Sequence, residues 1–310
     1  MSRPWWWERL RCPACGEDLD VSDTNGACAT CGEPCPRHEN VIQWGDVEDA
    51  PAPSRHRKGL AKYWATARYR LDPLASPYSP LTWLSRWRVE AYYRRALHDP
   101  ALARRWAARY LDGIALPASA AVLDHGCGRG RFAAFLSSLG HRVVGQDVLA
   151  HPWWRELPTA GFAVVPPERT RLPWRLQSFD LVLDWGVIGH FPEEALSEHA
   201  AEVFAALKPG GSWVVYEANA TGMGVHLNRR HYGRLHSVER VQLLATGAGF
   251  QVSRTFFEGV QSPVFPRAYS YAATHLSPRG FELGTGGSLL DRVVPPARRA
   301  LWMMHLRRPS

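Results

Sequence analysis

The chain has 310 residues, of which 45% are hydrophobic, and it carries a formal net charge of +8 with a pI of about 9.4. This is enough for one full α/β core, a small appended module and a cap, so we expect two modules. The sequence contains no run of 18 apolar residues, and MSRPWWWERLR at the N-terminus lacks the hydrophobic stretch of a signal peptide, which excludes stable membrane insertion and predicts a soluble, cytoplasmic protein.

The positive charge suits an anionic partner such as RNA or a membrane surface. However, lysine occurs only at positions 58, 62 and 208, and the many arginines occur together with many alanines. That bias also arises from a GC-rich genome. Charge therefore leaves a nucleic-acid partner open without requiring one.

Four cysteines near the N-terminus form two C-x2-C pairs, Cys12 with Cys15 and Cys28 with Cys31, separated by twelve residues. This spacing is typical of a zinc ribbon or a pair of zinc knuckles, and a glycine follows each pair where the chain must turn around the metal. Two disulfides are the alternative, but a reducing cytoplasm and such short pairs argue against them. We therefore predict a structural zinc ion in a domain spanning residues 1–44, with Cys35 and His38 as nearby spare ligands and a short strand around Val41-Ile42.

Residues 45–58 are rich in Asp, Glu, Pro and Ala, which predicts a linker, and residues 59–115 show aromatic and aliphatic residues at helical spacings, which predicts an N-terminal helical cap. Asp99-Pro100 suits a helix start. The helices either pack against the sheet or place Tyr63, Trp64 and Tyr69 over a cationic ligand, which aromatic faces stabilise.

The segment Ala121–Asp147 predicts a strand, a glycine-rich turn, a helix, a second strand and a carboxylate. Gly126, Gly128 and Gly130 allow the backbone to approach a ligand, and Asp147 is suited to accept hydrogen bonds from both hydroxyls of a ribose. The turn is G-x-G-x-G and no Gly-Lys-Ser/Thr follows, so a pyrophosphate or triphosphate is less favoured than another nucleoside cofactor.

From this turn onward, residues 121–308 resemble a class I S-adenosylmethionine-dependent methyltransferase. Leu172-Pro173-Trp174 matches the turn after the family's third strand, residues 178–184 its fourth strand, residues 185–191 the loop beside the methyl donor, and residues 207–211 the turn into the fifth strand, Ser212–Glu217. The resemblance implies a Rossmann-like, doubly wound α/β sheet of seven strands whose last hairpin is antiparallel, in residues 116–310. It also implies cofactor contacts at Asp124, Gly126, Cys127, Gly128, Gly130, Asp147, Val148, Glu168, Arg169, Asp184 and Trp185.

Beyond the fifth strand, residues 226–236 contain a dense set of titratable groups, and residues 258–296 resemble a substrate-covering insertion. The sulfonium is already an excellent leaving group, so catalysis needs mainly an in-line approach and, for a hydroxyl acceptor, one base. The candidates are His190, His231 and His226, because histidine titrates near neutral pH. Glu217 is interpreted as a residue that fixes a loop by hydrogen bonds.

The leading hypothesis is therefore an enzyme that transfers a methyl group from S-adenosyl-L-methionine to an O, N or C atom of a small-molecule metabolite. The first alternative is an RNA methyltransferase, because the N-terminal cysteine segment also resembles the short zinc domains of some bacterial rRNA methyltransferases and of a methyltransferase-activator module. A second alternative, a partner-binding scaffold with a decayed fold, conflicts with the intact glycines and Asp147. The sequence leaves the oligomeric state open.

Overall fold

The computed structural model describes residues 4–19, 27–35, 37–38, 40–44, 98–148, 150–157, 160–165, 171–222, 235–258, 294–299 and 301–310. Several features expected from the sequence lie outside these residues: the linker 45–58, most of the helical cap, most of the insertion 258–296, and the side chains of Tyr63, Trp64, Tyr69, Glu168, Arg169, His226, His231 and His38. Within the described residues, no helix combines the length and the hydropathy that crossing a membrane requires.

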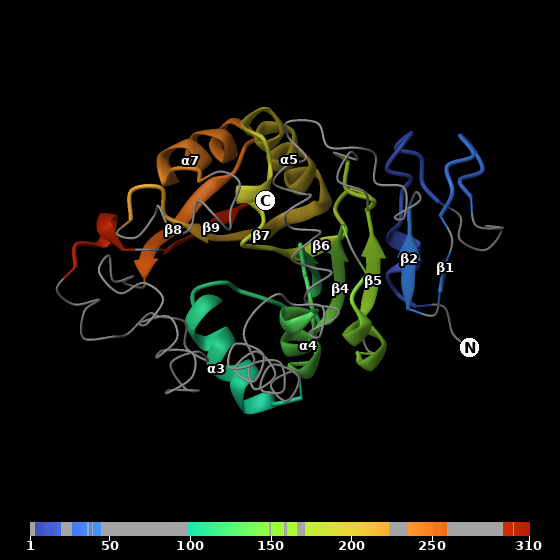
Figure 1. Ribbon diagram of the computed structural model, residues 1–310, viewed down its shortest axis with the longest axis horizontal. Helices are drawn as coiled ribbons and strands as arrows, with labels where there is room; N and C mark the ends of the chain where they lie inside the picture. The colour runs from blue at the N-terminus through green and yellow to red at the C-terminus, as the bar shows by residue number, and fades with distance from the viewer. Residues whose placement is uncertain are drawn as a thin grey trace, which may run out of the picture.

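The centre of the protein is a mixed β-sheet in the order β1-β2-β5-β4-β3-β6-β7-β9-β8 (Figure 1). The strands are β1 (Arg37–His38), β2 (Val41–Gln43), β3 (Ala121–His125), β4 (Arg142–Asp147), β5 (Gly161–Val164), β6 (Phe179–Trp185), β7 (Leu207–Ala218), β8 (Gln251–Glu258) and β9 (Leu301–Arg307). Strands β5, β4, β3, β6 and β7 are parallel, and β9 runs antiparallel between β7 and β8. The Rossmann-like sheet with an antiparallel last hairpin is thus confirmed.

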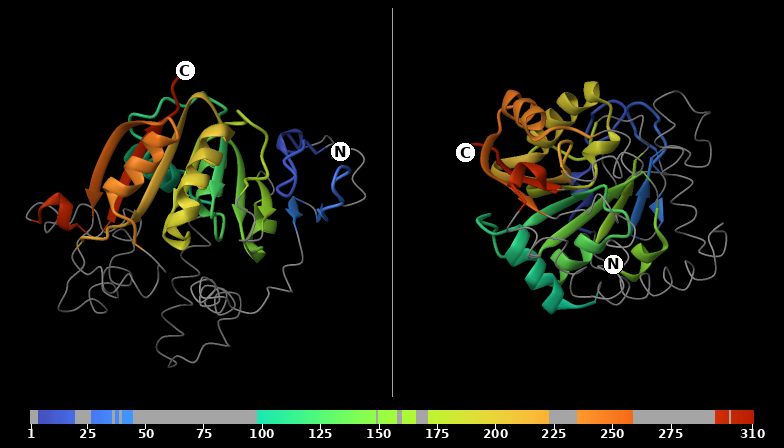
Figure 2. Two further views of the ribbon diagram at one scale, coloured as in Figure 1. Left: turned by 90° about the horizontal axis from the view of Figure 1, so that it is seen from above. Right: turned by 60° about the vertical axis from the view of Figure 1, so that its left-hand side comes forward.

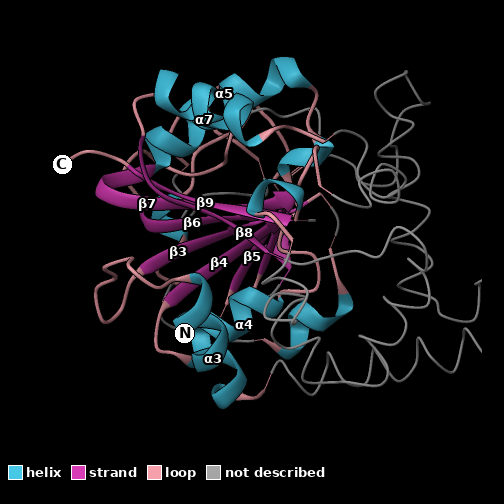
Figure 3. Ribbon diagram, turned by 90° about the vertical axis from the view of Figure 1, so that its left-hand side faces the viewer, coloured by secondary structure: helices cyan, strands magenta, loops and turns pink. Residues whose placement is uncertain are grey.

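Helices cover both faces of the sheet, with α3 (Pro100–Tyr110) and α4 (Arg131–Ser138) on one face and α5 (Glu193–Ala206) and α7 (Val238–Gly247) on the other (Figure 3). Asp99 begins α3 as expected, because its carboxylate accepts the N–H groups of Ala101 and Leu102 and Pro100 occupies the first helical position. The central strands, such as β3, are buried on both faces and therefore have no polar alternation.

The described sheet has nine strands rather than the expected seven, because β2 adds in parallel to the outer edge of β5, with Val41 opposite Phe162 and Gln43 opposite Val164, and β1 adds to β2 (Figures 1 and 2). The expected strand around Val41-Ile42 is present, but it extends the central sheet. An edge strand exposes unpaired backbone groups, and here the N-terminal segment covers those of β5.

Residues 4–11 also pack onto the central sheet. The side chain of Trp6 lies so close to Gly161 that a Cβ there would come within 2.1 Å of its indole nitrogen. The Arg11 guanidinium pairs with Glu202 of α5 and donates to the Leu172 carbonyl, and the Arg9 guanidinium donates to the Ser178 carbonyl. Together with the buried Trp44, these contacts join the N-terminal segment to the main hydrophobic core.

Candidate cofactor site and candidate metal centre

The glycine turn after β3, residues 126–130, is called the cofactor turn below. A Cβ on Gly126 would come within 2.3 Å of Val187 Cγ2, and the φ of Gly126 is +65°, so close approach and backbone conformation both require glycine there. A Cβ on Gly128, where φ is +53°, would meet no described atom within 4 Å. The cofactor turn is therefore packed against the loop after β6 on one side and presents bare backbone at Gly128.

The carboxylate of Asp147, at the end of β4, is fixed by the cofactor turn. Gly128 N–H donates to Asp147 Oδ2 at 2.7 Å, and Val148 N–H donates to Asp147 Oδ1 at 2.7 Å. An ionised carboxylate has about four acceptor positions, so it has the capacity to accept two vicinal hydroxyls as well. The geometry suits the ribose role expected from the sequence, with Gly128 and Asp147 at the same edge of the sheet.

Asp124, one residue before the end of β3, is 1% exposed. Its Oδ2 accepts the N–H of Ala133 in the first turn of α4 at 3.0 Å, whereas its Oδ1 has no hydrogen-bond partner among the described residues. Burial, reinforced by the nearby Asp147 carboxylate, raises the pKa of Asp124 to about 7. A buried carboxylate oxygen without a partner is costly, and a cationic ligand group would satisfy it.

Asp184 belongs to a buried polar cluster that the sequence did not reveal. Its Oδ1 is 2.6 Å from His125 Nδ1, and its Oδ2 is 2.7 Å from His199 Nε2 and 2.9 Å from Trp213 Nε1. A carboxylate only accepts, so each imidazole carries its proton on the nitrogen that faces Asp184. Burial alone would raise the pKa of Asp184, but His199 and His125 hold it well below its usual range. Both carboxylate oxygens of Asp184 are engaged inside the core. The expected contact of Asp184 with a cofactor would therefore be made by its backbone and not by its side chain.

Trp185, the last residue of β6, lies half-buried in an aromatic cluster with Trp106, Tyr110, Phe132 and Tyr216. The Trp185 ring stacks on Tyr216 at 4.0 Å between centroids, with an interplanar angle of 18°. The hydroxyls of Tyr216 and Tyr110 both donate to Glu258 Oε1, at 2.8 and 3.1 Å. Since β6, β7 and β8 end here, these side chains lie at the carboxyl edge of the sheet, where open α/β sheets bind ligands.

The loop after β6 carries the other expected residues. His190 is the last residue of η4 (Ile188–His190) and is half-buried. Glu217 Oε1 accepts the N–H of Gly189 at 3.3 Å, which confirms its interpretation as a loop-fixing residue, and burial raises its pKa to about 8. Cys127 is buried, with its sulfur 2.8 Å from the position that a Cβ on Gly145 would take.

Residues 122–211, from β3 to the first part of β7, match the family of methyltransferase domains. These residues contain the cofactor turn, Asp124, Asp147 and the loop after β6. This stretch of the chain is similar to a methyltransferase domain.

Two curated proteins resemble part of this chain. Sterol methyltransferase-like 2 of Botryococcus braunii is 28% identical over 163 residues, 46% of this chain and 41% of that protein. The S-adenosyl-L-methionine-dependent Diels-Alderase iccD of Talaromyces variabilis is 31% identical over 125 residues, 37% of this chain and 41% of that protein. The chain thus spans less than half the length of either relative.

Among solved structures, one similar chain is the 1,6-didemethyltoxoflavin-N1-methyltransferase of Burkholderia thailandensis, solved with 1,6-didemethyltoxoflavin and S-adenosylhomocysteine bound. It is 21% identical, the similarity covers 84% of this chain and 93% of that chain, and the TM-score is 0.48.

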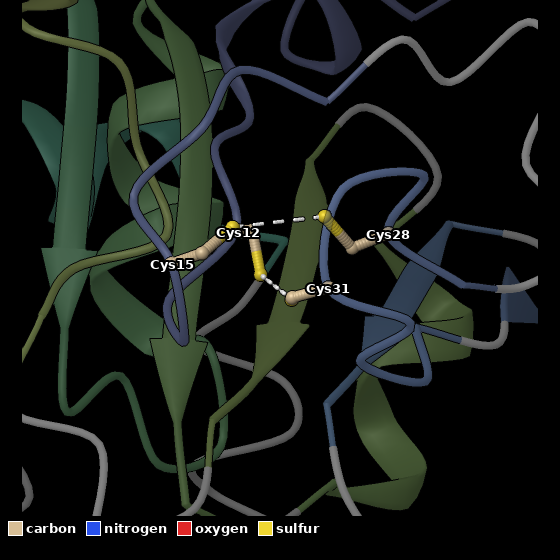
Figure 4. A group of neighbouring side chains, drawn as sticks. All are labelled: Cys12, Cys15, Cys28 and Cys31. Carbon is tan, nitrogen blue, oxygen red and sulfur yellow. Dashed lines mark hydrogen bonds between the residues drawn. The ribbon is translucent and has the colours of Figure 1, made fainter.

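The four cysteines form a compact cluster beside the methyltransferase domain (Figure 4). All four sulfurs lie within 4.8 Å of one another, with Cys12 and Cys31 Sγ 3.6 Å apart and Cys15 and Cys28 Sγ 3.8 Å apart. A tetrahedral zinc ion with Zn–S bonds of about 2.3 Å separates its sulfurs by about 3.8 Å. All four cysteines are free thiols, so the disulfide alternative is not found, and the cluster has the dimensions of a tetrahedral metal site.

The backbone around the cysteines favours thiolates. Gly16 and Gly32 adopt positive φ and their N–H groups close tight turns onto the carbonyls of Cys12 and Cys28. Burial opposes ionisation of Cys28, but hydrogen bonds from the N–H groups of Cys31 and Thr30 lower its pKa to about 7. Without a metal the four thiols differ, because burial raises the pKa of Cys12 to about 12 although the N–H groups of Cys15 and Ala14 lower it. Cys35 is buried outside the four-sulfur cluster. These features fit a metal that binds four thiolates.

Proposed function

We propose that the protein is a methyltransferase that moves the methyl group of S-adenosyl-L-methionine to an O, N or C atom of a small molecule. The observation that carries this proposal is the convergence of Gly128, Asp147 and the unpartnered Oδ1 of Asp124 at the carboxyl edge of one sheet. The backbone of Gly128 lets a nucleoside approach closely, Asp147 is suited to accept the two hydroxyls of a ribose, and Asp124 is suited to pair with an ammonium group. When bound, this cofactor supplies an electrophilic methyl group on a sulfonium.

The chain's own residues hold the reactants and exclude water. Asp147 and Asp124 would hold the two polar ends of the cofactor, and Glu168 and Arg169 remain expected contacts. The aromatic cluster around Trp185 supports an acceptor site at the ends of β6 and β7, since its stacked rings present apolar surface there and its hydroxyls are held by Glu258. For a hydroxyl acceptor, His190 is our candidate base because it follows the loop segment that touches the cofactor turn; His226 and His231 are further candidates.

We also propose that Cys12, Cys15, Cys28 and Cys31 bind a structural zinc ion. The sulfur spacing and the backbone N–H groups at the sulfurs support this assignment. The four thiolates saturate a tetrahedral ion and leave no open position for catalysis. We place the protein in the cytoplasm, where thiols stay reduced.

The test combines binding and transfer. Titration calorimetry with S-adenosyl-L-methionine should detect a complex, and Asp147→Ala should weaken it by about 1–3 kcal/mol, the range for hydrogen bonds to a charged group. Labelled methyl from the cofactor should then appear in a small-metabolite fraction of a cell extract. Label recovered only in RNA would favour the RNA alternative, and no binding to the parent protein would refute the methyltransferase assignment.

A further inference from the structure

The hairpin of β1 and β2 reaches the segment that leads away from Asp147. Asn40, directly before β2, donates its side-chain amide to the carbonyls of Trp154, Leu157 and Ala160 at 3.2, 3.4 and 3.1 Å. The backbone carbonyl of Asn40 accepts the N–H of Phe162 at 2.8 Å. One asparagine of the N-terminal segment therefore bonds to the connection between β4 and β5 at three carbonyls, which share the two hydrogens of its amide.

Trp154, in η3 (Pro152–Glu156), carries this contact on to the cofactor turn. Its indole N–H donates to the carbonyl of Gly128 at 2.9 Å, and its ring stacks on Phe162 at 4.5 Å with an interplanar angle of 7°. Trp154 is 1% exposed, so its ring has little freedom to move. The backbone N–H of Gly128 donates to Asp147. The backbone of Gly128 is thus held at both ends, by the expected ribose ligand and by Trp154.

The four-cysteine cluster lies in the chain directly before the segment that carries Asn40, and both belong to the N-terminal part of the main core. Cys28, Cys35 and Ile42 are buried in the same core cluster, and an isolated bridge between Ala27 and Pro34 closes the second cysteine turn. The proposed zinc ion would contribute part of the free energy that orders this segment, in addition to its packing on the central sheet. Loss of the metal would release the hairpin that places Asn40 against the β4–β5 connection.

From these contacts we infer that the N-terminal metal module positions the cofactor turn, acting through Asn40 and Trp154. The inference rests on the proposed function, because it concerns affinity for the methyl donor. Asn40 and Trp154 are positioning residues, since both act through Gly128. Coupling between two binding sites is reciprocal, so the metal raises affinity for the methyl donor and the donor raises affinity for the metal by the same factor.

The decisive variant is Trp154→Phe, which retains an aromatic ring to stack on Phe162 and loses the indole N–H that bonds Gly128 together with part of the ring volume. The matched control is Trp302→Phe, because Trp302 lies on β9 outside the N-terminal segment, is 0% exposed, and its indole nitrogen has no hydrogen-bond partner among the described residues. Asn40→Ala removes the side-chain hydrogen bonds from the N-terminal segment to the connection between β4 and β5. Calorimetry at a temperature well below the melting temperature of each variant measures the affinity of folded protein for S-adenosyl-L-methionine and S-adenosylhomocysteine.

We expect Trp154→Phe and Asn40→Ala each to weaken binding of both compounds about fivefold, which is the effect of one net hydrogen bond. Trp302→Phe should leave the affinity unchanged. In the parent protein, saturating donor should raise the affinity for zinc, measured in competition with a chromophoric chelator, and Trp154→Phe should reduce that increase.

A lower melting temperature with unchanged donor affinity in Trp154→Phe and Asn40→Ala would mean a merely structural role and would overturn the inference. So would zinc affinity that does not respond to donor in the parent protein. If the parent protein binds neither compound, the proposed function fails and this inference fails with it. If the parent binds and Asp147→Ala weakens binding while Trp154→Phe does not, only the inference is lost.

Discussion

The substitution Asp124→Asn should separate the stability of the fold from its affinity for the methyl donor. In the folded protein, burial raises the pKa of Asp124 from 3.8 to about 7. The folded state therefore binds this proton more tightly than the unfolded state does. The contribution of Asp124 to the free energy of unfolding is therefore highest below a pH of about 4, where the group is protonated in both states. It falls as the pH rises to about 7, where the total loss approaches about 4 kcal/mol at about 1.4 kcal/mol per pKa unit.

An asparagine at this position cannot ionise, so the variant should lack this loss. The difference in unfolding free energy, variant minus parent, should grow by roughly 3 kcal/mol between about pH 5 and about pH 8. Denaturant titrations of the ligand-free proteins at several pH values measure this directly. Effects of Glu217 and of the cysteines occur in both proteins and cancel in the difference.

Whereas the stability of the variant relative to the parent should rise with pH, the affinity of the variant for the methyl donor should be lower than that of the parent. An ionised Asp124 facing an ammonium group is worth about 1.5–3 kcal/mol, so the variant should bind S-adenosyl-L-methionine about 10- to 100-fold more weakly at a pH of about 7.5. Affinity of the parent protein should fall as the pH drops below about 7, because Asp124 becomes protonated, and the variant should show no such dependence. Parallel pH profiles of stability in the two proteins, or equal donor affinity, would refute this account of Asp124.

Three further changes test other parts of the structure. Asp184→Ala leaves His125, His199 and Trp213 without their common acceptor and should cost about 3–5 kcal/mol in denaturant unfolding; a loss below about 1 kcal/mol would contradict the buried network. Gly126→Ala should abolish donor binding through its clash with Val187 and its positive φ, and Val187→Ala in the same chain should restore part of the binding if the clash dominates. Removal of the metal with a chelator should lower the melting temperature of the whole protein by several degrees, with recovery on adding zinc; an unchanged main transition would show that the cysteines support only their own loops.

The sequence alone predicted the elements whose chemistry is local. The cofactor turn and its approach to Asp147 follow from glycines and a carboxylate at recognisable distances along the chain, whereas the Rossmann-like sheet with its antiparallel last hairpin was expected from the family resemblance. The cysteine cluster follows from the spacing of its pairs in the same way. In the cofactor turn and the cysteine cluster, the residues that meet are no more than 19 positions apart in the chain, so their spacing carries much of the geometry.

Tertiary structure decided the contacts between segments far apart in the chain. Nothing in the local pattern of residues 41–43 indicates that they pair with β5, because any short apolar strand can cover an open edge. His125, Asp184 and His199 lie on three different elements and meet only when β3, β6 and α5 pack together. The contact of Trp154 with Gly128 likewise depends on the fold, since a buried indole finds its acceptor only after the core has formed. The sequence thus determined which groups this protein presents, and packing determined which of them act together.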